Sequence, residues 1–279
     1  MDGGGARALV VCTDIGRPVR HSYAEPSQGS AAVALLVGCQ PDILALEPGA
    51  SGIHSYEVAD ACRPTADMET GDADLSLLSY LTCCEQSFAA YREAMGAIDF
   101  VRHFNLLAFH TPFGGMVKGA HRTLMRKLSS AAPDAIEADF RQRMAPSLTY
   151  CREVGNIYSG TIFLALAGAV DHGEDTAARR IGLFSYGSGC CSEFYSGMAP
   201  AGAGKAMAES GVADALAGRA RVPVARYDAL LDDHRSLAGV RDAAIGVAAA
   251  ADIYDDFFAG RGYLVLDRID GWQRRYRWS

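Results

Sequence analysis

Long apolar runs are missing from this sequence of 279 residues. The most apolar helical stretch, Thr161 to Val170, is too short to cross a bilayer, which takes about 20 residues. The start of the chain, MDGGGARALVVCTD, has no basic flank followed by a long apolar segment, so no signal peptide is predicted. Low-complexity tracts are missing as well, which argues against a disordered chain. We expect a globular cytoplasmic protein with no membrane partner.

The sequence also has no C-x-x-C pair, although it contains eight cysteines. This argues against a zinc or thiol-redox motif, and no metal site is predicted. The chain is long enough to bury a core without disulfides, so we expect reduced thiols. The adjacent Cys190 and Cys191 are predicted to begin a strand. That is a poor setting for a nucleophile, whose pKa must be lowered by a helix N-terminus or a nearby cation.

Positive charge is scarce, because 26 Lys and Arg face 33 Asp and Glu and the net charge is −7. The clearest basic cluster is at the end of the chain, where aromatic residues alternate with arginines. It comprises Trp272, Arg274, Arg275, Tyr276, Arg277 and Trp278. One short cluster on an acidic chain is weak evidence for nucleic-acid binding. We expect a terminal strand or a docked tail there, and no nucleic-acid partner.

Apolar segments of strand type alternate with segments of helix type. Strands are predicted at residues 8–12, 30–38, 42–46, 106–109, 181–186, 192–195 and 262–267. Helices are predicted at residues 74–95, 114–128, 156–170 and 222–234. The alternation indicates an α/β fold with a layered sheet. The region 48–72, rich in Gly, Pro and Asp, is the best candidate for an internal boundary.

A histidine directly follows the predicted strand 106–109, in the segment FHTPF. Open α/β sheets bind ligands at the carboxyl ends of their strands, which is where His110 falls. A neutral imidazole there can donate to a carbonyl oxygen, or take a proton, near neutral pH. The alternative is a structural histidine that caps the turn fixed by Pro112. The spacing alone leaves both interpretations open.

Asn156, in the segment VGNIY, is predicted to begin the helix 156–170. The simplest interpretation is an N-cap, whose side-chain oxygen accepts a hydrogen bond from the first helical turn. The alternative is that its amide points at a substrate carbonyl group, as an oxyanion donor does.

A glycine-rich turn follows the strand 181–186, in the segment FSYGSG. Gly187 and Ser188 are candidates for ligand binding, because small residues let a ligand approach the backbone closely. The alternative is a simple tight turn. The segment is neither a nucleophile elbow nor a phosphate loop, because G-x-S-x-G spacing and a following G-K-[ST] are both absent.

Taken in order, several segments resemble the 3-hydroxy-3-methylglutaryl (HMG)-CoA synthase family of the thiolase-like superfamily. They are ALVVCTDIG, EPSQGSAAVALLVG, CRP, AFHTPFGGMVKGA, EVGNIYSG and IGLFSYGSG, and the resemblance covers essentially the whole chain. The stretches YEVADACRPTADMETGDADLSLLSYLTCCEQSF and GSGCCSEFYSG are most similar to the branch that builds β-methyl branches on polyketides. The resemblance implies a thiolase-like layered α/β/α/β/α fold, incomplete in its N-terminal half. Residues 1–50 would belong to that half and residues 51–279 to the C-terminal half.

The resemblance also implies a reaction. In the family a cysteine is acetylated, a glutamate removes a proton from the acetyl methyl group, and the enolate attacks the β-ketone of an acceptor thioester. His110 and Asn156 would hold oxygens of the acceptor. Gly187 and Ser188 would lie beside its thioester, and Lys118 would lie where the family contacts the phosphopantetheine or nucleotide. No cofactor is expected, since the acyl groups arrive on CoA or on a carrier protein, and the polyketide-like segments favour the carrier protein.

The family's nucleophilic cysteine and its glutamate lie upstream of the strand that matches ALVVCTD. We therefore expect neither to have a counterpart here, since Cys12 falls inside that strand. Arg17 is followed by Pro18, where the family tends to have a tyrosine. Without the nucleophile and the glutamate, acetylation and enolate formation would not proceed on this chain alone. Strands near the N-terminus would also expose unpaired edges.

Three hypotheses remain open from the sequence. The chain is the acceptor-binding part of a split or truncated HMG-type synthase, with a separate chain that supplies the cysteine and the glutamate. Alternatively, it is a non-catalytic subunit that binds acyl thioesters or carrier proteins. In the third hypothesis the start codon is misassigned and the native chain is longer. A complete protein of this kind is expected to form a homodimer.

Overall fold

The structure is a computed structural model, and it describes residues 5–65, 68–96, 98–174, 177–237, 239–245 and 251–279. The chain forms two compact units, Met1–Val212 and Ala213–Ser279, which are described separately. The predicted division after residue 50 concerns the two halves of a thiolase-like fold and stays a prediction. It falls inside a strand of the first unit.

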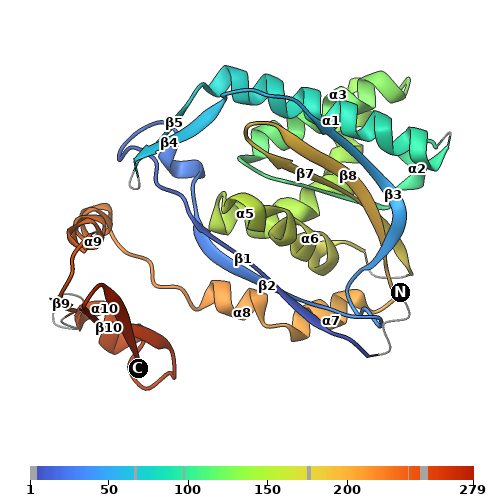
Figure 1. The fold of residues 1–279 in the computed structure, drawn as a ribbon. Helices are drawn as coiled ribbons and strands as arrows, with labels where there is room; N and C mark the ends of the chain where they lie inside the picture. Colours follow the sequence, from blue (N-terminus) through green and yellow to red (C-terminus); the bar gives the residue numbers. More distant parts are fainter. Residues whose placement is uncertain (1–4, 66–67, 97, 175–176, 238, 246–250) are drawn as a thin grey trace. The chain divides into compact units, whose positions relative to one another are not determined.

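The centre of the first unit is a four-stranded sheet in the order β3-β8-β7-β6 (Figure 1). Its strands are β3 (Ala45–Ser55), β6 (Leu106–Phe109), β7 (Arg179–Gly187) and β8 (Cys191–Ala199). β7 and β8 form an antiparallel hairpin, whereas β6 runs parallel to β7. Because β6 and β7 are parallel, their carboxyl ends meet at one edge of the sheet. The residues that follow these two strands, from His110 and from Ser188 onward, therefore lie at that edge.

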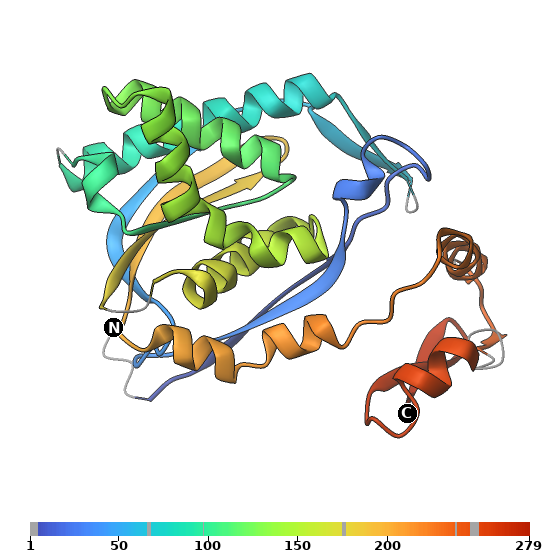
Figure 2. The ribbon, with the colours of Figure 1, turned by 180° about the vertical axis from the view of Figure 1, so that it is seen from behind.

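Helices cover both faces of this sheet (Figure 1, Figure 2). The long helix α1 (Ala73–Met95) packs on β3 and β8 and on α3 (Gly114–Leu128), while α6 (Thr161–His172) packs on β6 and β7. Asp72 caps α1 by accepting the N–H of Leu75 at 2.9 Å. The core between α1 and the sheet is aromatic, because Phe88 contacts the rings of Tyr91, Phe100, Phe104 and Phe194.

Shorter elements complete the first unit. The helical ones include α2 (Phe100–His103), α4 (Pro133–Asp139), the π-helical turn Phe140–Met144, α5 (Leu148–Val154), the 3-10 turn Tyr158–Gly160 and α7 (Ala203–Glu209). Two antiparallel pairs stand apart from the main sheet: β1 (Ala8–Ile15) with β2 (Ser30–Val37), and β4 (Ala61–Thr65) with β5 (Met68–Gly71).

The second unit is a small sheet with short helices. Its sheet has the order β11-β10-β9, with β9 (Ala243–Ala244), β10 (Leu264–Asp270) and β11 (Gln273–Trp278). The helices are α8 (Val212–Ala217), which begins at the last residue of the first unit, α9 (Val224–Ser236) and α10 (Ala251–Phe257). The basic and aromatic end of the chain is thus a terminal strand, one of the two alternatives that the sequence allowed.

Several predicted elements are confirmed, among them the strand 106–109 and the helix 114–128. The region 48–72 contains strands, because β3 continues to Ser55 and β4 and β5 follow. Its Pro48 and Gly49 lie in a bulge of β3, where the pairing with β8 shifts register between Leu46 and Ser51. In the part of the chain that the structure describes, no helix has both the length and the apolar character needed to cross a membrane.

The helix predicted from residue 156 begins only at Thr161. Tyr158, two residues into the predicted helix, has a left-handed φ of 53°. That angle breaks the right-handed path that a helix requires. Asn156 therefore lies in a turn before α6, and the prediction that it begins the helix was wrong.

Candidate functional site

His110 is held by its backbone at the end of β6. Its N–H donates to the carbonyl oxygen of Phe184 at 2.7 Å, and its carbonyl accepts the hydroxyl of Tyr80 at 2.7 Å. The side chain is buried, and burial lowers the pKa of the imidazole to about 4. The ring is therefore neutral at physiological pH, with one nitrogen that donates and one that accepts. Among the residues that the structure describes, no hydrogen bond to either ring nitrogen is present.

The backbone of Asn156 is held by two hydrogen bonds to the segment before β2. Its backbone N–H donates to the carbonyl of Ser27 at 2.8 Å, and its carbonyl accepts the N–H of Gly29 at 2.9 Å. The preceding Gly155 must be glycine, because a Cβ there would lie 2.7 Å from the carbonyl oxygen of Gln28 and its φ is positive. The loop before β2 and the loop before α6 are thereby joined at Asn156.

The Asn156 side chain does not cap α6, whose N-cap position is Gly160. Its Oδ1 accepts the backbone N–H of Tyr158 at 3.0 Å and the hydroxyl of Thr161 at 3.1 Å. The side chain thus closes a local turn in the manner of an Asx-turn. With Oδ1 occupied, the –NH2 group is the half of the amide that can meet a ligand, as the oxyanion-donor interpretation requires.

A cavity of about 140 Å³ joins Asn156 to the segment after His110. Its walls include Thr111 and Pro112 from that segment, Cys151 from α5, and Ser27 from the loop before β2. Burial raises the pKa of the Cys151 thiol to about 11, so this cysteine is protonated at neutral pH and is a weak nucleophile. The cavity is a small, partly apolar space, and the polar residue Asn156 lies on its wall.

Gly187 is the exposed last residue of β7, and Ser188 follows it in the exposed turn to β8. The turn is anchored by Asp60, a fully buried residue that the sequence analysis did not single out. Its Oδ1 accepts the N–H of Gly189 at 3.0 Å, and its Oδ2 accepts the hydroxyl of Tyr186 at 3.0 Å. The ring of Tyr186 in turn lies 6.2 Å from the ring of His110. Asp60 therefore connects the glycine-rich turn to the neighbourhood of His110.

Lys118 is the fifth residue of α3 and makes its own contacts. Its Nζ forms an ion pair with Glu137 at 2.9 Å and lies 5.4 Å from the centre of the Phe140 ring. The ion pair lowers the pKa of the Glu137 carboxyl. Lys118 lines neither the cavity beside Asn156 nor the larger cavity between α2 and α4. The structure does not bring it together with the other predicted residues, and its role stays a prediction.

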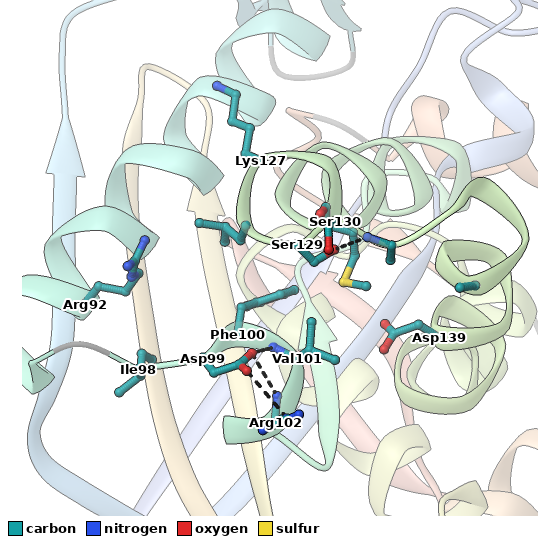
Figure 3. Close-up of a pocket in the computed structure, with 14 residues that line it drawn as sticks. Arg92, Ile98, Asp99, Phe100, Val101, Arg102, Lys127, Ser129, Ser130 and Asp139 are labelled. Atoms are coloured by element: carbon teal, nitrogen blue, oxygen red, sulfur yellow. Dashed lines mark hydrogen bonds and ion pairs between the residues drawn. The ribbon is translucent and has the colours of Figure 1, made fainter.

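The larger cavity, of about 800 Å³, lies between the end of α1, α2, the end of α3 and α4 (Figure 3). None of the predicted site residues lines it. Its carboxylates have partners: Asp99 accepts the N–H of Val101 at 2.9 Å, and Asp139 is bound by Arg143 at 2.8 Å and by His121 at 2.6 Å. This cavity shares no lining residue with the one beside Asn156.

The architecture is that of the thiolase-like HMG synthases. The chain superimposes with a TM-score of 0.94 on the HMG synthase of the curacin biosynthetic pathway in complex with acetyl donor-ACP, at 47% sequence identity. That match covers 98% of this chain and 67% of the curacin synthase. PksG from Bacillus subtilis, an HMG-CoA synthase, matches with a TM-score of 0.92 and 44% identity over 98% of this chain and 67% of that one.

Sequence comparison gives the family. Residues 121–276 match the model of the hydroxymethylglutaryl-coenzyme A synthase C-terminal domain. The polyketide biosynthesis 3-hydroxy-3-methylglutaryl-ACP synthase PksG of Bacillus subtilis is 43% identical, over 98% of this chain and 68% of its own length. The hydroxymethylglutaryl-CoA synthase of Enterococcus faecalis is 34% identical over 80% of this chain and 57% of its own length. The chain belongs to the HMG-CoA synthase family and spans between about half and two thirds of these two relatives.

Proposed function

We propose that this chain forms the acceptor side of a hydroxymethylglutaryl-type synthase. Such an acyltransferase joins an acetyl thioester to a β-ketoacyl thioester in an aldol-type condensation, either in polyketide β-branching or in the formation of HMG-CoA. The observation that carries the proposal is a buried, neutral His110 at the carboxyl end of β6. The residues that follow it, Thr111 and Pro112, line a cavity that Asn156 also lines. The 43% identity to PksG favours polyketide β-branching.

In the proposed condensation, the methyl carbon of the acetyl enolate forms a bond to the β-carbon of the acceptor. The electron pair of the β-ketone moves to its oxygen, and the N–H of the neutral His110 imidazole stabilises the charge that develops there. The –NH2 group of Asn156 donates to the thioester carbonyl of the acceptor. Gly187 and Ser188 lie beside that thioester, and Lys118 contacts its phosphopantetheine or nucleotide.

His110→Ala tests this assignment. In an assay that supplies the acetylated partner, we expect the rate of condensation to fall by about 10²–10³, the usual effect of removing one hydrogen-bond donor to a developing oxyanion. The HMG-type thioester product is followed by mass spectrometry. Unchanged turnover would refute the role of His110, whereas loss of folding is checked by circular dichroism.

The acetyl-carrying cysteine and the glutamate would come from sequence beyond this chain or from a separate chain. Three cysteines of the chain are poorly suited to the task, because burial raises the pKa of Cys83, Cys84 and Cys151. The test is the intact mass of the chain after incubation with acetyl-CoA or an acetylated carrier protein. A stable acetyl adduct on this chain alone contradicts the proposal.

The proposed partners are CoA thioesters or acyl carrier proteins, and we favour the carrier protein as acetyl donor. A curacin-pathway relative has been solved in complex with acetyl donor-ACP, and PksG is named a 3-hydroxy-3-methylglutaryl-ACP synthase. Comparing acetyl-CoA with an acetylated carrier protein at equal concentration in the condensation assay decides between them. We also propose a cytoplasmic location, where thiols are kept reduced.

A second candidate function is that of a binding subunit that works with another polypeptide, in place of a catalytic domain. The β1–β2 pair favours it, because Leu9 and Leu36 are each 68% exposed and Val11 is 54% exposed. Such an apolar surface is typical of an interface. If this candidate is correct, the chain binds acetoacetyl-CoA without turning it over and co-purifies with a second chain. If light scattering shows a homodimer, a second copy of the chain becomes the candidate partner for this surface.

A further inference from the structure

The hydroxyl of Thr161 makes two hydrogen bonds, and only one of them satisfies a backbone group at the start of α6. Thr161 is the first residue of α6 and is completely buried. Its Oγ1 accepts the backbone N–H of Ile157 at 2.9 Å, which satisfies one of the free donors ahead of the helix. Its proton goes to Oδ1 of Asn156 at 3.1 Å. The second bond connects α6 to the site and has no part in starting the helix.

The hydrogen-bonding capacity of the Asn156 amide fixes its orientation. Oδ1 has two lone pairs, and they take the N–H of Tyr158 and the hydroxyl of Thr161. A flipped amide would place the –NH2 group against the Tyr158 N–H, where two donors face each other without an acceptor. The hydroxyl of Thr161 would then lose the acceptor for its only proton. The oxygen and the nitrogen of an amide are similar in size and shape, so the hydrogen bonds decide which of them is free to meet a ligand.

We propose that Thr161 is a positioning residue for the thioester site: its hydroxyl holds the Asn156 amide so that the –NH2 group faces the ligand. This rests on the proposed role of Asn156 as a donor to the acceptor thioester. The cavity wall then presents a hydrogen-bond donor, and the ligand atom that meets it is an acceptor, such as a carbonyl or alkoxide oxygen of the acyl thioester.

Two substitutions separate the hydroxyl from the rest of the side chain. Thr161→Val keeps the size and the β-branched shape of the side chain but removes both bonds of the hydroxyl. Thr161→Ser keeps the hydroxyl and removes a methyl group. Thr149→Val, on the neighbouring α5, is the matched control for the change of Thr to Val itself.

Hydrogen exchange in the ligand-free protein tests the positioning by itself. In Thr161→Val we expect the backbone amides of Ile157 and Tyr158 to exchange about tenfold faster, because one loses its acceptor and the other loses the partner that steadies Oδ1. In Thr161→Ser and Thr149→Val both rates stay within about twofold of the starting protein. Equal protection in Thr161→Val would overturn the proposal.

Binding of acetoacetyl-CoA tests the link to the site. We expect Thr161→Val to weaken binding about tenfold and Thr161→Ser to bind as the starting protein does. In the Asn156→Ala background, Thr161→Val should have no further effect, because both substitutions act through the Asn156 amide. An equal loss in both backgrounds would show a general structural effect and would overturn the proposal. If the unsubstituted chain does not bind acetoacetyl-CoA, the proposed function fails, while hydrogen exchange still decides the positioning.

Discussion

Two pairs of apolar strands in the first unit have different surroundings. β6 reads LLAF and is buried along its whole length beside β7, with α6 packed on the two strands. β1 reads ALVVCTDI and pairs with the equally apolar β2, yet no residue of either strand is fully buried. Similar strand sequences thus have very different surroundings, because burial depends on what packs on a strand. Four substitutions test this difference, and Phe88→Ala should have the largest effect.

The aromatic cluster under α1 should carry the largest share of stability. Phe88→Ala removes a ring that contacts four other aromatic rings, and we expect a loss of about 3–5 kcal/mol in the free energy of unfolding. Leu78→Ala on the exposed face of the same helix is the control and should cost less than about 1 kcal/mol. Both tryptophans lie in the second unit, so unfolding of the first unit should be followed by far-UV circular dichroism in urea.

His110 should make stability depend on pH. Its folded-state pKa of about 4 lies below the value of about 6.5 expected in the unfolded chain. Between these values the unfolded state binds more protons, so stability is full above pH 6.5 and falls as the pH drops toward 4, by up to about 3 kcal/mol.

In His110→Gln this part of the pH dependence should disappear, and in His172→Gln, at the exposed end of α6, it should remain. The measurement is urea unfolding at a series of pH values. Identical pH profiles for the His110 variant and the starting protein would contradict the buried, neutral state of the ring.

Asp60 should have an intermediate effect. Asp60→Ala leaves the buried hydroxyl of Tyr186 and the N–H of Gly189 without their acceptor, and we expect a loss of about 2 kcal/mol. Asp60→Asn keeps one acceptor and should lose less. A double variant with Tyr186→Phe should recover part of the loss, because the unpaired hydroxyl is then gone. Strict additivity of the two changes would argue against the shared hydrogen bond.

The smallest effect should come from the β1–β2 pair. Leu36→Thr replaces an exposed apolar side chain by one that suits a strand, and the free energy of unfolding should change by less than about 0.5 kcal/mol. The substitution should also reduce self-association in sedimentation velocity experiments. A loss of several kcal/mol would mean that this surface is covered in solution.

Elements and site residues could be predicted from the sequence where a local pattern determines them. β6, α3 and His110 follow from local patterns, an apolar run and a helical period, and the structure confirms the two elements. The anchoring of the glycine-rich turn by Asp60 joins residues 129 positions apart, and no local pattern reports such a bond. The bulge of β3 has the composition of a linker, and the turn at Asn156 has that of a helix start. The structure of the bulge depends on the pairing of β3 with β8, and the turn depends on the backbone angle of Tyr158.

The close contact of Gly155 with the loop before β2 has a mechanical consequence. The carbonyl of Ser27 and the N–H of Gly29 are bonded to the backbone of Asn156, and β2 begins at the next residue, Ser30. The start of β2 is therefore fixed to the backbone of Asn156. A polypeptide that binds the exposed surface of the β1–β2 pair would shift or steady this attachment, and with it the asparagine that lines the cavity.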